Sequence, residues 1–395
     1  MSQIALSSRL TYAAAALAAS ALTLGLAACG GSEDSSSSNS DRVRIGLEAP
    51  LSGDLQAAGE GMLNGARLAA DEINARGGLQ GKDVEIVPID DGGDPTIGVP
   101  AARKAIDEGL SGVVAAWNTG VGIEMLPLYE KAGLVPIRLA AGNELAGLGF
   151  TVSPMSSQVA PVTADALSKW IGAKTVAIGF DPTQSYSRQM SRAVRSRLES
   201  EGVDVTAFEP VEPGAEDYSG TVKKLAAGNP DAIFYSVYFP EGALIAKETP
   251  TGGSSPACLL GYASYDTGYV ENAGATDARN CDVVGLPAPD EFKDSSTHVS
   301  DYQDQFGEAP GAMSPYAYDS LNVLAHGVEQ AGGFDADALT GALNKVSGFR
   351  GWTGPITLER GTGNRVPSTV TVDEVNEHGV LSVDPSWAKA VGASY

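Results

Sequence analysis

IGLEAPLSGDLQAAGEGMLNGARLAADEINARGGLQGKDVEIVPIDDGGDP, residues 45–95, is the stretch that decides the fold. Apolar residues alternate with charged or small ones over residues 43–47, which predicts a strand. Over residues 61–76 apolar residues recur at three- and four-residue steps, which is typical of one face of a helix. Residues 84–87 then predict a second strand. Strand, helix and strand in this order form a βαβ unit, and such units build parallel sheets.

The loop at residues 50–59 lies between the first strand and the helix. It contains Pro50, Ser52, Gly53 and Asp54, which are all frequent in turns. Ligands of open α/β sheets bind beyond the carboxyl ends of the strands. We therefore expect this loop to form part of a binding edge.

The sequence of residues 45–82, followed by DDGGDP at residues 90–95, closely resembles the first lobe of the leucine/isoleucine/valine-binding protein family. These proteins are type I extracytoplasmic solute-binding proteins of ABC importers. The resemblance extends over nearly the whole chain after an N-terminal leader. It implies an α/β protein with the type I periplasmic-binding-protein fold, in which two doubly wound α/β lobes are joined by three hinge crossings.

The rest of the chain repeats the alternation of strands and helices in two sets, which favours two lobes. Lobe 1 is expected over residues 42–152 and 286–354, and lobe 2 over residues 153–285 and 355–395, with the third crossing at residues 354–358. Further strands are expected at residues 113–115, 135–139, 175–180, 203–208, 232–237, 258–260, 283–286 and 370–375. Further helices are expected at residues 95–108, 123–132, 162–171, 187–201, 217–227, 241–247, 298–306, 317–332 and 336–346.

The composition describes a globular and acidic protein. Hydrophobic residues make up 43% of the chain and charged residues 19%, which argues against a disordered chain. The net charge of −23 argues against a nucleic-acid partner, because phosphate binding needs clustered Lys and Arg.

The N-terminus has the pattern of a lipoprotein leader. Arg9 precedes an uncharged run at residues 12–26, which ends in Leu26-Ala27-Ala28-Cys29. We expect residues 1–28 to be a signal peptide and Cys29 to be lipidated, which would place the protein outside the cytoplasm and anchor it to the cell membrane. Residues 29–41 would then form a flexible polar tether. The alternative is an ordinary signal peptide with an incidental cysteine.

Two further cysteines, Cys258 and Cys281, lie in the expected second lobe. An exported domain in an oxidising compartment favours a disulfide between them. The alternative is two buried free thiols.

Patterns of catalysis or metal binding are missing from the sequence. No Gly-x-Ser-x-Gly motif is present, and Asp90, Asp91 and Asp94 lack the alternating ligands of a calcium loop. Asp94 is better explained as a helix cap. We therefore expect a binding protein without metal or cofactor, not an enzyme. The histidines are scattered and lack metal-ligand spacing: His298, His326 and His378.

Loops at the strand ends are expected to line a cleft between the lobes, which would close on a small-molecule ligand. The alternative to a ligand-binding role is, for each tyrosine among them, a half-buried aromatic residue that packs against its neighbours. For Trp117 the alternative is that it only covers the core. The candidate ligand-binding residues are Ala58, Trp117, Asn118, Thr119, Ala140, Ala141, Gly142, Asn143, Tyr186, Tyr238, Tyr262, Ala263 and Tyr316, from the loops at residues 55–59, 117–119, 140–143 and 262–265 and from single positions.

The resemblance implies roles for four of these residues. Thr119 matches a hydroxyl position that binds the ligand carboxylate, and Ala140 a position that contributes its backbone nearby. Tyr186 and Tyr238 match aromatic positions on the second lobe.

The chain departs from the family at three positions. Ala58 stands where the family has an aromatic residue, Gly142 where it has a hydroxyl residue, and Ala263 where it has the acid that pairs with the ligand ammonium. Asp266 could replace that acid only if the loop is rearranged. A buried ammonium without an acidic partner is unfavourable. We therefore hypothesise that simple branched-chain amino acids are not the best ligands, and that a planar or apolar body carrying a carboxylate fits better.

These features together predict a monomeric, lipid-anchored solute-binding protein that delivers a small metabolite to an ABC permease and its ATPase. The alternative is a ligand-sensing protein of the same fold that acts on a signalling partner. An exported enzyme would need a catalytic group that the sequence does not reveal.

Overall fold

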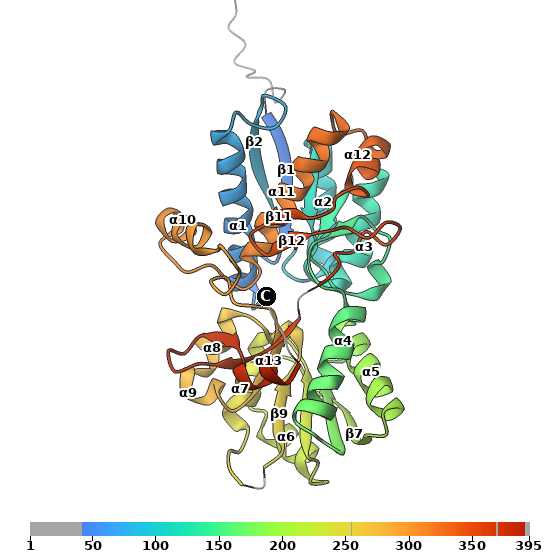
Figure 1. Cartoon of the computed structure of the whole chain (residues 1–395). Helices are drawn as coiled ribbons and strands as arrows, with labels where there is room; N and C mark the ends of the chain where they lie inside the picture. The colour runs from blue at the N-terminus through green and yellow to red at the C-terminus, as the bar shows by residue number, and fades with distance from the viewer. Residues whose placement is uncertain (1–41, 254, 369, 392–395) are drawn as a thin grey trace, which may run out of the picture. The chain divides into compact units, whose positions relative to one another are not determined.

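The computed structural model describes residues 42–253, 255–368 and 370–391 (Figure 1). The predicted signal peptide, Cys29 and the tether lie outside the described residues and stay predictions. Within the described part of the chain, no helix is long and apolar enough to cross a membrane.

The first sheet is parallel throughout and has the strand order β2-β1-β3-β4-β5. β1 pairs with β2 along its whole length, with Ile45 opposite Ile86, which confirms the predicted βαβ unit. Because the strands are parallel, their carboxyl ends share one edge. The strands are β1 (Arg42–Ala49), β2 (Asp83–Asp90), β3 (Gly112–Ala115), β4 (Pro136–Arg138) and β5 (Phe150–Thr151).

The second sheet has the order β14-β13-β10-β9-β8-β6-β7, with only β13 and β14 antiparallel to their neighbours. The carboxyl ends of its parallel strands β6 to β10 likewise share one edge. The strands are β6 (Thr175–Phe180), β7 (Asp204–Pro210), β8 (Ala232–Ser236), β9 (Ala257–Leu260), β10 (Asp282–Gly285), β13 (Thr371–Val375) and β14 (Leu381–Val383).

Helices from two distant parts of the chain accompany the first sheet, because the segment after β10 of the second sheet returns to it. Asp94 caps α2 by accepting a hydrogen bond from the Thr96 amide at 2.7 Å, as predicted. The helical segments are α1 (Gln56–Ala75), α2 (Pro95–Asp107), α3 (Thr119–Lys131), the 3₁₀ turn η1 (Asn143–Leu145), α10 (Ser296–Phe306), α11 (Ser314–Ala331) and α12 (Ala336–Leu343).

The helical segments of the second part include three short helices, α8, α9 and α13, that the sequence analysis did not predict. The segments are α4 (Ser156–Asp165), which continues as a π-helical turn (Ala166–Trp170), α5 (Ser185–Ser200), α6 (Ser219–Ala226), α7 (Phe239–Glu248), the 3₁₀ turn η3 (Tyr262–Ser264), α8 (Thr267–Ala273), α9 (Ala275–Ala278) and α13 (Pro385–Val391).

Most helices begin earlier than predicted, and three of these differences concern the expected binding edge. α1 starts at Gln56 instead of residue 61, α3 at Thr119 instead of residue 123, and α5 at Ser185 instead of residue 187. Their first turns lack the apolar stripe by which periodicity detects a helix, because these turns face the edge of the sheet. Ala58 and Tyr186 therefore belong to helices and not to loops.

The segment expected to be the third crossing begins with one strand of a hairpin. β12 (Gly354–Ile356) pairs antiparallel with β11 (Phe349–Gly351). Buried Asp319 of α11 holds this hairpin by accepting the amide hydrogens of Trp352 at 2.7 Å and Thr353 at 2.9 Å. The boundaries of the two lobes stay a prediction.

Two buried arginines tie together the segment that leaves β5 and the segment that leads to β13. Arg138 donates to Oδ1 of Asn364 at 2.9 Å, and Arg365 donates to the carbonyl oxygens of Thr353 at 2.6 Å and Val152 at 3.4 Å. Burial lowers the pKa of Arg138 to about 10, so it stays charged at neutral pH. The connections between the sheets are thus held by fixed hydrogen bonds.

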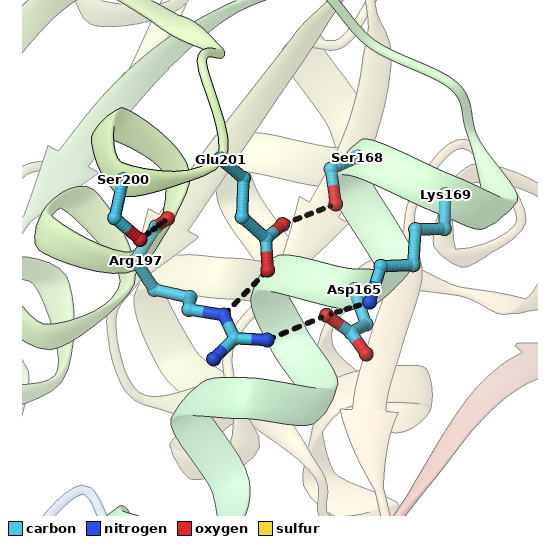
Figure 2. A network of polar contacts seen from close by, with 6 residues as sticks. All are labelled: Asp165, Ser168, Lys169, Arg197, Ser200 and Glu201. Carbon is cyan, nitrogen blue, oxygen red and sulfur yellow. Dashed lines mark hydrogen bonds and ion pairs between the residues drawn. The ribbon is translucent and has the colours of Figure 1, made fainter.

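Polar contacts join α5 to the helical segment before it, as Figure 2 shows. Arg197 contacts Glu201 at 2.5 Å and Asp165 at 3.6 Å, and Lys169 contacts Asp165 at 2.8 Å. Ser168 donates to Glu201 at 2.9 Å. These side chains are partly exposed, so each ion pair contributes at most about 1 kcal/mol. They orient the helices more than they stabilise the fold.

Cys258 and Cys281 form a disulfide with an S–S distance of 2.02 Å, which confirms that prediction. Cys258 lies in β9, and Cys281 directly precedes β10. The bond therefore closes the connection that carries η3, α8 and α9.

Replacing both cysteines (Cys258→Ala/Cys281→Ala) should lower the free energy of unfolding. The bonded residues are 23 positions apart. Without the bond the unfolded chain gains entropy, which for a loop of this size lowers the free energy of unfolding by roughly 3 kcal/mol. Urea unfolding under oxidising conditions measures the effect. Equal stability of the variant and the unaltered protein would show that the bond contributes nothing.

Candidate ligand-binding site

A small cavity of about 20 Å³ lies where loops of the two sheets meet. Tyrosines dominate its wall, and no charged side chain takes part. It is lined by Trp117, Leu139, Ala141, Tyr186, Tyr238, Tyr262, Ala263, Tyr265 and Met313. We call it the aromatic cavity.

Aromatic contacts connect the parts of the wall that come from the two sheets. The ring of Trp117, which follows β3, meets the ring of Tyr238, which follows β8, edge to face at 5.7 Å. Tyr186 and Tyr262 lie 6.4 Å apart, and the Tyr262 hydroxyl contacts Sδ of Met313 at 3.7 Å. Burial raises the pKa of Tyr186 and Tyr262 well above the usual value, so both hydroxyls stay protonated. The wall is thus neutral and aromatic.

Four helices begin around the aromatic cavity. Asn118, Tyr238 and Met313 are the N-caps of α3, α7 and α11, and Tyr186 lies in the first turn of α5. In none of these four helices does the side chain of the N-cap residue accept a hydrogen bond from a backbone amide of the first turn. Helix N-termini carry free N–H groups and partial positive charge, which favour an anion. The arrangement therefore suits a carboxylate, although no cationic side chain lines the cavity.

Buried polar atoms near the cavity lack partners. Both amide atoms of Asn118, Oγ1 of Thr119 and the hydroxyl of Tyr186 have no hydrogen-bond partner among the described residues. Such atoms are rare in proteins, since each costs free energy when it is left unpaired. They lie at the start of α3 and α5, where they are available to a polar ligand.

The backbone at the end of β3 is bent sharply. Ala116 has a φ of 55°, which is unusual for a residue other than glycine. Its carbonyl accepts hydrogen bonds from Leu139 at 3.1 Å and Ala140 at 2.7 Å. The bend turns the chain so that Trp117 lines the cavity and Asn118 begins α3.

The predicted site residues divide into two groups. Trp117, Ala141, Tyr186, Tyr238, Tyr262 and Ala263 line the aromatic cavity. Tyr265, from the predicted loop at residues 262–265, lines it as well. Leu139 and Met313 were not predicted, because an apolar residue at a strand end or a helix start carries no chemical signal. The residues that do not line the cavity are Ala58, Asn118, Thr119, Ala140, Gly142, Asn143 and Tyr316.

Asn143 has a bridging position instead. Its amide donates to Oε1 of Gln189 at 2.8 Å, and its side-chain oxygen accepts from the Ser157 amide at 3.0 Å. The carbonyl of Ala141 accepts from the amide of Ser156 at 2.7 Å. These bonds fix the loop after β4 to α4 and α5.

Gly142 has no space for a side chain. A Cβ atom there would lie 2.2 Å from Cγ2 of Thr119 and 2.8 Å from its Oγ1. Thr119 therefore occupies the space into which a side chain at position 142 would project.

Asp266 does not supply a carboxylate to the aromatic cavity. It caps α8, where Oδ1 accepts from the Gly268 amide at 2.9 Å, and it lines a different cavity. Ala263 lines the aromatic cavity in its place, which leaves that wall without an acid.

Two buried carboxyl groups lie at the carboxyl ends of β1 and β2. Glu48 accepts a short hydrogen bond from the Tyr129 hydroxyl, and Asp91 accepts from the Gly93 amide at 2.7 Å. Burial and the nearby Asp91 raise the pKa of Glu48 to about 8, and burial raises that of Asp91 to about 7. In the described ranges, no group of three or more His, Cys, Asp or Glu residues could hold a metal ion.

The sequence model of the family described as "Periplasmic binding protein" matches residues 42–379. A Leu/Ile/Val-binding protein of Rhizobium johnstonii is 29% identical over 307 residues, which cover 76% of this chain and 83% of that protein. The leucine-, isoleucine-, valine-, threonine- and alanine-binding protein of Pseudomonas aeruginosa is 26% identical over 309 residues, which cover 77% of this chain and 82% of that protein.

Solved structures show the same fold. A leucine-binding protein of Thermotoga maritima superposes with a TM-score of 0.79 at 24% identity and covers 87% of this chain and 97% of its own. A branched-chain amino acid transporter substrate-binding protein of Streptococcus pneumoniae, in complex with isoleucine, gives a TM-score of 0.75 at 24% identity, with 87% and 99% covered. The predicted fold of two parallel-sheet lobes is confirmed.

Gly142→Ala should destabilise the protein, because the new Cβ overlaps Thr119. Overpacking of this kind costs roughly 1–3 kcal/mol. Thr119→Ser removes the closer atom, so the double variant should recover most of the loss. Urea unfolding of the single and double variants gives the coupling. Gly220→Ala is the matched control, because a Cβ there meets nothing within 4 Å. Additive effects of the two substitutions would contradict the proposed overlap.

Glu48→Gln should reduce the dependence of stability on pH. The folded protein holds the Glu48 proton up to about pH 8, against an ordinary pKa of 4.5. The stabilisation by the protonated form is therefore complete below pH 4.5 and is lost as the pH rises through 8. The unfolding free energy of the variant should fall less between about pH 5 and pH 9. Glu377→Gln, at an exposed position, serves as the control. Parallel pH profiles for all three proteins would refute the assignment.

Proposed function

This chain belongs to the periplasmic binding protein family, and we propose that it captures a small carboxylate with an apolar body and delivers it to an ABC importer. It is an extracytoplasmic binding protein and not an enzyme. The observation that carries the proposal is the aromatic cavity, which is surrounded by the N-termini of α3, α5, α7 and α11.

The charge around the aromatic cavity supports a carboxylate ligand. Four helix starts direct partial positive charge towards it, and Asn118, Thr119 and Tyr186 supply polar atoms that lack partners. The aromatic rings of Trp117 and Tyr238 then offer a surface for an apolar body. The named relatives bind leucine, isoleucine and valine, which have such a body and a carboxylate.

The ammonium group separates two ligand classes. No acidic side chain lines the aromatic cavity, because Ala263 stands in its wall and Asp266 lines another cavity. An ammonium buried there would have only neutral partners, and the faces of the aromatic rings would be its best ones. We therefore place acids without an amino group above the corresponding amino acids in affinity.

The size of the aromatic cavity requires the lobes to move. A space of 20 Å³ holds about one water molecule, so a metabolite must enter while the walls are apart. Trp117 and Met313 belong to segments that accompany the first sheet. Tyr186, Tyr238 and Tyr262 belong to segments of the second sheet. Ligand contacts to both parts favour the closed form, and only this difference in affinity drives closure.

Delivery follows from closure in this proposal. Asn118 and Thr119 bind the carboxylate first, and the tyrosines of the second lobe then exclude water, which strengthens the polar contacts. The closed form docks on an ABC permease, and its ATPase supports release into the transport path. Lipidation of Cys29 would hold the protein at the membrane, and the segment at residues 29–41 would give it reach.

The matched ligands 4-methylpentanoate and leucine, which differ only by the amino group, test the ligand class. Calorimetry on residues 41–395 should show tighter binding of 4-methylpentanoate, by roughly tenfold or more, because desolvation of an unpaired ammonium costs over 1 kcal/mol. Tyr186→Phe should weaken binding, since it removes a hydroxyl without another partner. Tyr218→Phe is the control, because its hydroxyl donates to the Glu212 carbonyl away from the cavity.

Two outcomes would count against the proposal in different ways. Tighter binding of leucine would keep the binding function but reverse the order of the ligand classes. If Tyr186→Phe and Tyr218→Phe changed the heat of binding equally, the aromatic cavity would be excluded as the binding site.

A further inference from the structure

A second, larger cavity of about 370 Å³ lies next to the aromatic cavity. Its volume is in the range of small-molecule sites, which begins at about 300 Å³. Tyr265 lines both cavities and forms the wall between them. Apolar side chains make up most of the remaining wall, with Val299 and Ala312 on one side and Val270 and Leu381 on the other. We call it the acidic cavity, for the reason given next.

All charged groups in the wall of the acidic cavity are carboxylates. Asp266, Glu271 and Asp290 line it, and no Lys or Arg does. Glu271 and Asp290 are exposed, whereas Asp266 is only 1% exposed. The cavity thus combines an apolar surface with a negative charge at depth.

The two carboxylate oxygens of Asp266 differ in their hydrogen bonds. Its Oδ1 accepts from the Gly268 amide at 2.9 Å and lies 3.5 Å from the Thr267 hydroxyl. Its Oδ2 accepts no hydrogen bond from the described residues. Burial raises the pKa of this carboxyl to about 6, so it is mostly ionised at neutral pH. Because Asp266 lines the acidic cavity, this oxygen is available to a hydrogen-bond donor there.

The wall of the acidic cavity comes from segments on both sides of the cleft. Val299 belongs to α10, and Ala312 precedes α11; both helices accompany the first sheet. Val270 belongs to α8, and Leu381 begins β14 of the second sheet. A molecule bound there would contact both sides, so it would favour the closed form.

We propose that the acidic cavity is a second ligand site, which binds an amphipathic organic cation with its amine on Asp266 and its apolar body against Val299 and Leu381. This site goes beyond the proposed function, because its ligand has the opposite charge and another position. Binding at the two cavities should be reciprocal, since both ligands favour closure.

Three probes of similar shape test the charge preference: 2-phenylethylamine, 2-phenylethanol and 3-phenylpropanoate. Calorimetry and thermal shift of residues 41–395 should detect 2-phenylethylamine and show weaker binding of the neutral alcohol. Asp266→Asn keeps a good N-cap for α8 but removes the charge. It should weaken amine binding by roughly tenfold, as the loss of a charge-assisted hydrogen bond implies.

The matched control is Asp94→Asn, which makes the same change at another N-cap whose Oδ1 also accepts an amide hydrogen two residues on. It should leave amine binding unchanged. Equal affinity for the amine and the alcohol would overturn the proposal, as would an amine affinity that Asp266→Asn leaves intact or no amine binding at all. Tyr186→Phe separates the two sites: it should weaken 4-methylpentanoate and spare the amine, so failure of one site is distinguishable from failure of the other.

Discussion

The close packing of α1 against α11 is the constraint on which the rest of the structure depends. A Cβ atom at Gly65 would lie 2.2 Å from the carbonyl oxygen of Ser314, and the Ser314 hydroxyl donates to the Gly61 carbonyl at 2.8 Å. Only glycine at position 65 permits this approach. Because α11 follows β10 of the second sheet in the chain, this contact brings the chain back to the first sheet (Figure 1). The chain must then pass between the two sheets repeatedly, and Arg138 and Arg365 secure those passages.

The sequence predicted most strands of both sheets but placed most helix starts too late, and only some of the predicted site residues line the aromatic cavity. Buried strands leave clear apolar runs, so β6 lies where it was expected. First helical turns at the cleft carry polar or small residues, so periodicity missed the start of α3 at Thr119. The tyrosines of the cavity were found because each follows a strand end. The side chain of Asp266 could not be placed, because only the folded loop decides whether a carboxylate caps a helix or enters a cleft.

The net charge of the protein is negative, whereas the partial charges around the aromatic cavity are positive. The chain carries a net charge of −23, yet the aromatic cavity is bounded by the positive ends of helix dipoles. Salt screens exposed charges beyond about 8 Å, so the distant carboxylates act weakly at the cavity. Helix termini act within a turn of their ligand, and burial preserves their effect. Neighbouring cavities can therefore favour opposite charges, since Asp266 dominates one and the dipoles dominate the other.

The return of α11 to the first sheet also bears on how the chain is made. During synthesis, the first lobe lacks α11 until residue 331 has been added, and the second sheet lacks β13 until residue 375. Domains fold as units once their segments are present. Neither lobe can therefore bury its complete core until most of the chain has been synthesised. A chain of this topology thus completes both cores only near the end of its synthesis.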